Sequence, residues 1–150
     1  ITPLLADPAG LALAVELMTN PYRDAAIDVV VGAESRGFIF GTAIARSLNT
    51  GFIPVRKPGK PPSKTMRQEY ELEYGTDALE IHCDAFSKGQ NVLIVDDLIT
   101  SAHATANLIR EAGAEVIGAS FVIDLPDLGG RKKLEAIGVP VRTLIEFEGD

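Results

Sequence analysis

The sequence has little cysteine, no long apolar run and no internal repeat. Its single cysteine, Cys83, cannot form an internal disulfide, which is compatible with a reducing compartment. No apolar stretch approaches the roughly 18 residues that a membrane-spanning helix needs. No signal-peptide pattern opens the chain. We therefore expect a cytoplasmic protein without a membrane partner.

Basic residues are also in the minority. The chain has 14 basic and 21 acidic residues and a net charge of −7, which argues against broad, non-specific binding of nucleic acid. The basic charge is concentrated at residues 55–67, "VRKPGKPPSKTMR", where no acidic residue occurs. Composition alone leaves two interpretations of this stretch, an ordinary basic loop or an anion site.

The length of 150 residues and the hydrophobic content of 46% predict a single domain, residues 1–150, with a sizeable core. The opening residues, "ITPLLADP", read as a start inside a fold, so we expect a further segment upstream. Asp7 and Pro8 are typical of a helix start, an N-cap followed by proline in the first turn.

Short apolar strands alternate with helices along the chain. We expect strands at 27–33, 51–55, 91–95, 115–123 and 141–147, and helices at 8–19, 37–48, 102–112 and 129–138. Residues 68–76 are compatible with a two-stranded arm, and 78–82 would be its return strand or an edge strand. This order predicts an α/β fold with a mainly parallel sheet flanked by helices. Ligands bind beyond the carboxyl ends of the strands in such sheets. The loops that matter most are therefore 34–37, 56–67 and 96–105.

Two adjacent carboxylates, Asp96 and Asp97, follow the apolar strand 91–95 and precede a helix. Carboxylates can accept hydrogen bonds from vicinal hydroxyls, and the N–H groups of a helix start favour an anion. The pair therefore suits a ligand with hydroxyls on one side and phosphate on the other. The alternative is that one of the two aspartates only caps the helix.

Five segments carry a family resemblance. They are "GAESRGFIFGTAIA" (32–45), "GFIPVRKPGKPP" (51–62), "YELEYGTDALEIH" (70–82), "VLIVDDLITSAHAT" (92–105) and "DLPDLGGRKKLE" (124–135). Together they resemble the adenine phosphoribosyltransferase family, of type I phosphoribosyltransferases, in family order over essentially the whole chain. The resemblance implies the Rossmann-like type I fold with a flexible arm over the active site. It also implies a homodimer and a missing base-recognition segment before Ile1.

The reaction that the resemblance implies transfers ribose 5-phosphate from phosphoribosyl pyrophosphate (PRPP) to adenine, giving AMP and pyrophosphate in purine salvage. The cofactor would be Mg²⁺, held through PRPP and water rather than by direct protein ligands. The implied pyrophosphate contacts are Arg36, Gly37, Arg56, Lys57 and Lys60. The implied catalytic residues are Asp96 and Asp97, which hold the ribose hydroxyls, and Glu73 and Tyr74 of the arm. Leu125 would line the base pocket.

Some of these residues have simpler explanations. Arg36 could instead form a surface ion pair, and Glu73 could be a solvated residue of the arm. The segment 121–128 is expected to line part of the base pocket, but the residues leave the choice of purine base open.

The loop that would hold the 5′-phosphate departs from the family pattern. Family members usually have Ala-Thr-Gly-Gly-Thr where this chain has Thr100, Ser101, Ala102, His103 and Ala104. A phosphate loop often uses positive φ angles, which cost an alanine roughly 1–2 kcal/mol. Ser101 keeps one hydroxyl, and His103 could donate to phosphate, best when protonated. Three outcomes are therefore open: a rearranged loop that still binds phosphate with weakened activity, which we favour because the other motifs are intact, a catalytically impaired enzyme, or a regulatory protein that binds PRPP or AMP without turnover.

Overall fold

The computed structural model describes residues 1–58, 65–72, 75–82 and 84–147. Its helices are α1 (Thr2–Ala6), α2 (Pro8–Thr19), η1 (Asn20–Tyr22), α3 (Arg36–Leu48), α4 (Ala102–Glu111), η2 (Pro126–Leu128) and α5 (Gly130–Ala136). Its strands are β1 (Val29–Ala33), β2 (Gly51–Val55), β3 (Thr65–Leu72), β4 (Gly75–His82), β5 (Asn91–Leu98), β6 (Glu115–Asp124) and β7 (Val141–Glu146).

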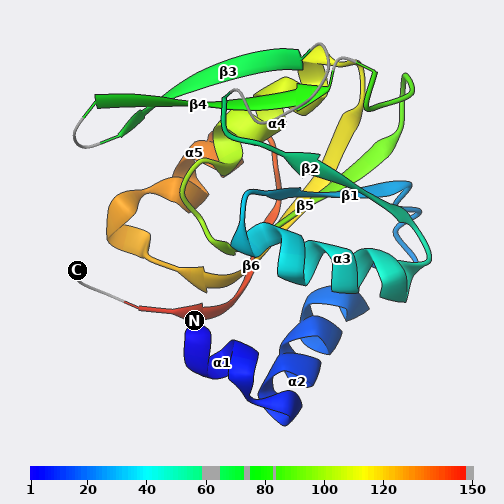
Figure 1. Ribbon diagram of the computed structural model, residues 1–150, viewed down its shortest axis with the longest axis vertical. Coiled ribbons are helices and arrows are strands. Elements are labelled where there is room, and N and C mark those ends of the chain that lie inside the picture. Colours follow the sequence, from blue (N-terminus) through cyan, green and yellow to red (C-terminus); the bar gives the residue numbers. More distant parts are fainter. Residues whose placement is uncertain (59–64, 73–74, 83, 148–150) are drawn as a thin grey trace.

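Five strands form the central sheet in the order β2-β1-β5-β6-β7, and every neighbouring pair is parallel. Helices cover both faces, with α2 and α3 on one side and α4 and α5 on the other (Figure 1). The expected α/β fold with a parallel sheet is therefore confirmed. Within the described part of the chain, no helix is both long and apolar enough to cross a membrane.

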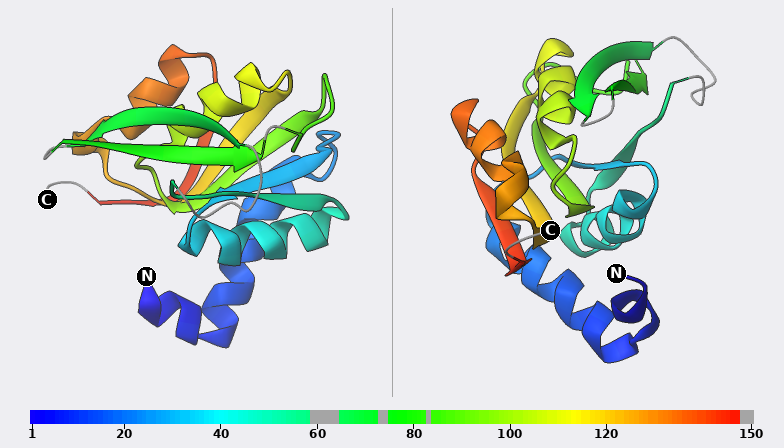
Figure 2. Two further views of the ribbon diagram at one scale, coloured as in Figure 1. Left: turned by 45° about the horizontal axis from the view of Figure 1, so that its top comes forward. Right: turned by 90° about the vertical axis from the view of Figure 1, so that its left-hand side faces the viewer.

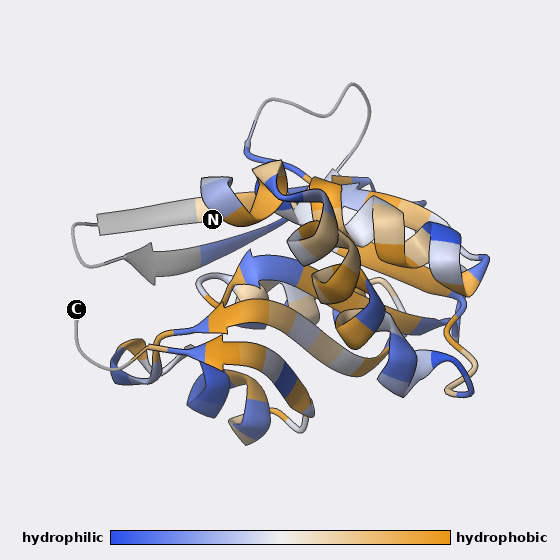
Figure 3. Cartoon of the chain, turned by 90° about the horizontal axis from the view of Figure 1, so that it is seen from below, coloured by the Kyte–Doolittle hydropathy of each residue, from blue (hydrophilic) through white to orange (hydrophobic). Residues whose placement is uncertain are grey.

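The apolar strands follow from burial on both faces of the sheet. Alternate side chains of a strand point to opposite faces, so a strand covered on both sides needs apolar residues throughout. Val31 and Ile94 lie in the core under α4, whereas Val30 and Leu93 lie in the core under α2 and α3. Figure 3 shows hydrophobic residues concentrated along the strands of this sheet.

Strands β3 and β4 form a separate antiparallel hairpin, in a register that runs from Thr65 opposite His82 to Leu72 opposite Gly75. The hairpin lies beside the sheet on the α4 side (Figure 2), and Ile81 is buried in the core there. The expectation that 78–82 is the return strand of the arm is confirmed. The flexibility of the arm stays a prediction.

Several boundaries differ from the sequence-based expectation. Helix α1 was not expected, β1 begins at Val29 rather than at residue 27, and β3 begins inside the basic stretch. The largest difference is in β5, which continues through the aspartates to Leu98 because Asp96 and Leu98 still pair with β6. The two carboxylates therefore belong to the strand itself and not to the loop after it.

Candidate active site

Three neighbouring strands end side by side, and their register decides which side chains meet. Gly32 of β1 pairs with Val95 of β5, so the residues after each lie next to one another. On the other side of β1, the N–H of Glu34 donates to the carbonyl of Val55 at 2.9 Å. Glu34 therefore lies between the end of β2 and the aspartates of β5.

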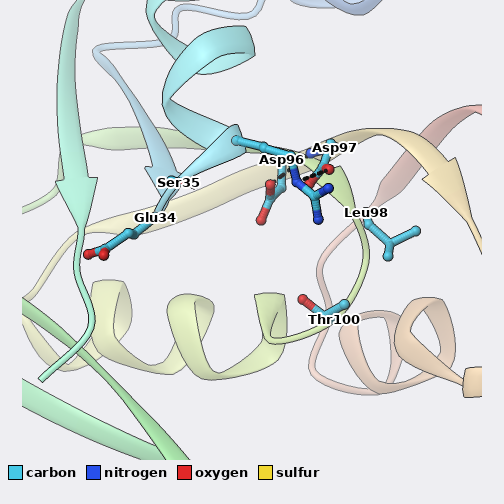
Figure 4. Close-up of a pocket in the computed structure, with 7 residues that line it drawn as sticks. Glu34, Ser35, Asp96, Asp97, Leu98 and Thr100 are labelled. Carbon is cyan, nitrogen blue, oxygen red and sulfur yellow. Dashed lines mark hydrogen bonds and ion pairs between the residues drawn. The ribbon is translucent and has the colours of Figure 1, made fainter. Parts of the chain in front are cut away.

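A cavity of about 450 Å³ opens at this edge of the sheet. Its lining consists of Glu34, Ser35, Arg36, Asp96, Asp97, Leu98 and Thr100. Figure 4 shows these groups coming from three places: the loop after β1, the end of β5 and the loop before α4. Of the three loops singled out from the sequence, 34–37 and 96–105 converge here, whereas none of the described residues of 56–67 lines the cavity. The lining is mostly polar and charged.

Arg36 and Asp97 form an ion pair across this cavity, with 2.8 Å between Nε and Oδ2. The Asp97 side chain is 9% exposed, whereas that of Arg36 is 56% exposed. The carboxylate is thus fixed in the wall, while the guanidinium reaches solvent. The guanidinium is therefore accessible to a ligand in the cavity while it pairs with the buried carboxylate.

The neighbouring carboxylate of Asp97 affects the protonation of Asp96. Burial, followed by the hydrogen bond and the negative charge of Asp97, raises the pKa of Asp96 to about 8. The Asp97 N–H, which donates to Asp96 Oδ1 at 2.7 Å, and the charge of Arg36 act in the opposite direction. Asp96 is therefore mainly protonated at neutral pH, so the doublet carries about one negative charge rather than two.

Glu34 links the site to the end of β2. Its Oε1 accepts hydrogen bonds from Arg56 Nε and from the Lys57 N–H, each at 3.0 Å. Arg56 itself is held to the hairpin, because its N–H and carbonyl both bond to the backbone of Glu80 at 2.8 Å. The start of the basic stretch is thereby tied to the loop after β1.

Two glycines let the loop after β1 approach the strands closely. A Cβ on Gly37 would lie 3.1 Å from Asp96 Oδ1 and 3.2 Å from the Val95 carbonyl oxygen. A Cβ on Gly32 would lie only 2.5 Å from the Gly37 carbonyl oxygen. The start of α3 therefore packs against the aspartates in a space that a larger side chain would occupy.

Two helices begin at the cavity edge, α3 at Arg36 and α4 at Ala102. Neither N-cap residue, Ser35 or Ser101, makes a capping hydrogen bond with its side chain. The first N–H groups of a helix and its dipole favour an anion. The site thus combines carboxylates suited to hydroxyls with two helix starts suited to phosphate.

The 100–104 segment lacks the glycines of the family pattern, and its backbone conformation shows that it does not need them. Helix α4 begins at Ala102, and among the described residues other than glycine only Ala26 and Asn49 have positive φ angles. The left-handed strain considered for this loop does not occur, because the helix expected to begin at residue 102 does begin at Ala102. His103 is half-buried, and burial and then the charge of Lys133 lower its pKa, which favours the neutral imidazole at pH 7.

Other predicted residues lie apart from the cavity or outside what the structure describes. Leu125 is half-buried at the N-cap of η2 and is not among the residues that line the cavity. Lys60, Glu73, Tyr74 and Cys83 fall outside the described residues. Their assigned roles stay predictions.

The position of Glu34 as a bridge was missed from the sequence. The signal in the sequence is that each of two neighbouring strands is followed by a charged residue of opposite sign. Glu34 follows β1, and Arg56 follows β2, the strand that pairs parallel with β1. Because Ala33 pairs with Val55, the parallel register places Glu34 beside Arg56. The sequence alone could not supply that register.

Comparisons with known proteins agree with this geometry. The sequence profile of the family described as "Phosphoribosyl transferase domain" matches residues 2–147. A curated adenine phosphoribosyltransferase from Chelativorans sp. is 55% identical over 152 residues, which cover 99% of this chain and 84% of the relative. Another, from Brucella anthropi, is 52% identical over 153 residues, which cover all of this chain and 84% of the relative.

Solved structures agree as well. The crystal structure of adenine phosphoribosyltransferase from Rhodothermus marinus has a TM-score of 0.92 and 49% identity, covering 98% of this chain and 85% of that one. The enzyme from Saccharomyces cerevisiae, complexed with an imino-altritol bisphosphate and adenine, has a TM-score of 0.86 and 40% identity, covering 96% and 84%. From the sheet, the carboxylate doublet and these matches, the chain belongs to the adenine phosphoribosyltransferase family.

Proposed function

We propose that this protein transfers ribose 5-phosphate from PRPP to adenine and releases AMP and pyrophosphate. The observation that carries the proposal is the common cavity, in which Asp96 and Asp97 lie beside Arg36 and the start of α3. In the reaction the bond from the anomeric carbon to pyrophosphate breaks, and a bond to the adenine nitrogen forms. Positive charge develops on the ribose while negative charge leaves on pyrophosphate.

The carboxylate doublet would hold the ribose. A neutral Asp96 can both donate to and accept from a hydroxyl, and the Asp97 carboxylate, paired with Arg36, can accept from one. The pair therefore matches two vicinal hydroxyls, each of which can donate or accept. The negative charge at Asp97 is also placed to stabilise positive charge that develops on the ribose ring.

Arg36 would bind the departing pyrophosphate. In the structure it pairs with Asp97, and its guanidinium is more than half exposed. A diphosphate offers it a more highly charged partner and a bidentate geometry. Its transfer from Asp97 to pyrophosphate would leave the carboxylate charge for the ribose at the moment when that charge is needed.

The 5′-phosphate would lie at the start of α4, against Thr100, Ser101 and the first helical N–H groups. Glu73 and Tyr74 would act from the arm, with Glu73 exchanging a proton with adenine, and Leu125 would contact the base. These roles rest on the family resemblance.

Mg²⁺ is the proposed cofactor. The carboxylates around the cavity are oxygen donors of the kind that magnesium prefers. Among the described residues there is no cluster of three or more potential ligands that could hold a metal ion. The family resemblance implies that the ion would be held through PRPP oxygens and water, where it would neutralise diphosphate charge.

The proposal includes a cytoplasmic homodimer, which rests on the family resemblance. The altered 100–104 loop favours one competing function, a protein that binds PRPP or AMP without turnover. A single assay separates the possibilities. The protein is incubated with PRPP, Mg²⁺ and adenine, hypoxanthine or guanine in turn, and nucleotide formation is followed.

We expect turnover with adenine alone. Turnover with hypoxanthine or guanine instead would assign a different base to the same chemistry. Binding of PRPP without turnover of any base would support the regulatory function and overturn the enzymatic one.

A further inference from the structure

Glu34 holds together the two loops that carry the cations of the site. One oxygen, Oε1, accepts from both Arg56 Nε and the Lys57 N–H at 3.0 Å. Figure 4 shows Glu34 pointing away from Asp96 and Asp97. The carboxylate therefore faces the residues after β2 and not the aspartates.

The ion pair is more sheltered than a surface pair. The side chains of Arg56 and Glu34 are 32% and 21% exposed, and the Glu34 N–H is already bonded to β2. Both backbones are thus fixed before the side chains meet, which lowers the entropy cost of the pair. Because Glu34 Oε1 accepts from both Arg56 Nε and the Lys57 N–H, the Arg56 side chain is held in one orientation.

Arg56 is also anchored from the other side. Its backbone forms two hydrogen bonds with Glu80 of β4, and the Thr65 hydroxyl of β3 donates to the Glu80 carboxylate at 3.1 Å. The arginine therefore joins the base of the hairpin to the loop after β1. A contact through Nε still leaves the Nη edge of a guanidinium able to fork onto two phosphate oxygens.

We propose that Glu34 is a positioning residue: by accepting from Arg56 Nε and the Lys57 N–H, it sets the Nη groups of Arg56 to receive the diphosphate of PRPP. The proposal rests on the function proposed above. A carboxylate next to a diphosphate site repels the ligand, so charge alone predicts that its removal would tighten binding. Positioning predicts the opposite, because Arg56 would lose its fixed orientation.

The opposite signs make Glu34→Gln the decisive variant, since it keeps the shape but replaces the charge-assisted hydrogen bond to Arg56 Nε with a neutral one of roughly half the strength. Binding of inorganic pyrophosphate with Mg²⁺ and binding of AMP are measured by titration calorimetry, together with KM for PRPP and kcat. We expect pyrophosphate affinity to fall about tenfold, the size of one hydrogen bond to a charged group. KM for PRPP should rise similarly, with smaller changes in kcat and AMP affinity.

Two further variants separate positioning from a general loss of structure. Glu34→Asp keeps the charge but shortens the reach, and it should also weaken pyrophosphate binding. In the Arg56→Gln background, Glu34→Gln should have little further effect, because Glu34 acts mainly through Arg56. Urea unfolding of each variant reports its stability.

Tighter pyrophosphate binding by Glu34→Gln would overturn the inference, as would equal losses of pyrophosphate and AMP affinity. Both outcomes leave the proposed function standing, provided that the unaltered protein forms AMP. A native protein that neither binds pyrophosphate nor forms AMP would overturn the proposed function and the inference with it.

Discussion

The protonation of Asp96 has a measurable effect on stability. Its pKa is raised to about 8 in the folded protein, whereas the pKa of an aspartate in an unfolded chain is about 4. Between these values the folded protein holds a proton that the unfolded chain has lost. Stability from this group is therefore fully present below about pH 4 and is lost as pH rises toward 8.

The Asp96→Asn substitution removes this titration while preserving the shape of the side chain. One proton difference changes the free energy of unfolding by about 1.4 kcal/mol per pH unit. From pH 5 to pH 7 the variant should therefore gain up to roughly 3 kcal/mol relative to the unaltered protein. The gain comes from the falling stability of the unaltered protein as the pH rises.

The measurement is urea unfolding, followed by circular dichroism at pH 5, 6 and 7. Asp24→Asn, at an exposed turn after η1, controls for the general effect of losing a carboxylate. Parallel pH profiles for the Asp96→Asn variant and the unaltered protein would refute the reasoning. They would mean that Asp96 is ionised in the folded protein and that the doublet carries two charges.

Three further predictions test the packing, the cation and the phosphate loop. Gly32→Ala should lower the free energy of unfolding by roughly 1–3 kcal/mol, because its Cβ would lie 2.5 Å from a backbone oxygen. Gly51→Ala, where the Cβ would meet no atom within 4 Å, is the matched control. Equal free energies of unfolding for the two variants would contradict the prediction. Arg36→Ala should weaken pyrophosphate binding in calorimetry by roughly 10- to 100-fold, through loss of charged hydrogen bonds; unchanged affinity would exclude it from the site. His103→Gly combined with Ala104→Thr should not raise kcat/KM for PRPP, because both residues lie in the first turn of α4, where no positive φ is needed, and residue 104 is buried in the core. A tenfold rise in steady-state kinetics would count against this account of the loop.

Much of the fold could be predicted from the sequence because burial leaves a clear pattern. The continuous apolar runs at 29–33 and 92–95 are buried on both faces of the sheet, and their alternation with helices indicated parallel strands. The end of β5 was harder to place. Asp96 and Asp97 look like the end of a strand, yet pairing with β6 continues past them to Leu98.

The site could be predicted in part for the same reason. The rule that ligands bind at the carboxyl ends of parallel strands placed Arg36 and the aspartates at one edge. It could not show that Asp97 already pairs with Arg36, or that Glu34 binds Arg56, because both contacts depend on the register between strands. The start of α4 at Ala102 agrees with the helix expected at 102–112, but that expectation was not used to conclude that the 100–104 segment lacks positive φ angles.

A crystal structure of the protein with AMP and pyrophosphate tests the central claim most directly. We predict ribose hydroxyls within about 3 Å of the Asp96 and Asp97 carboxylates, and pyrophosphate against Arg36 and the start of α3. A nucleotide bound away from this doublet, or a pyrophosphate on another face of the molecule, would contradict the account.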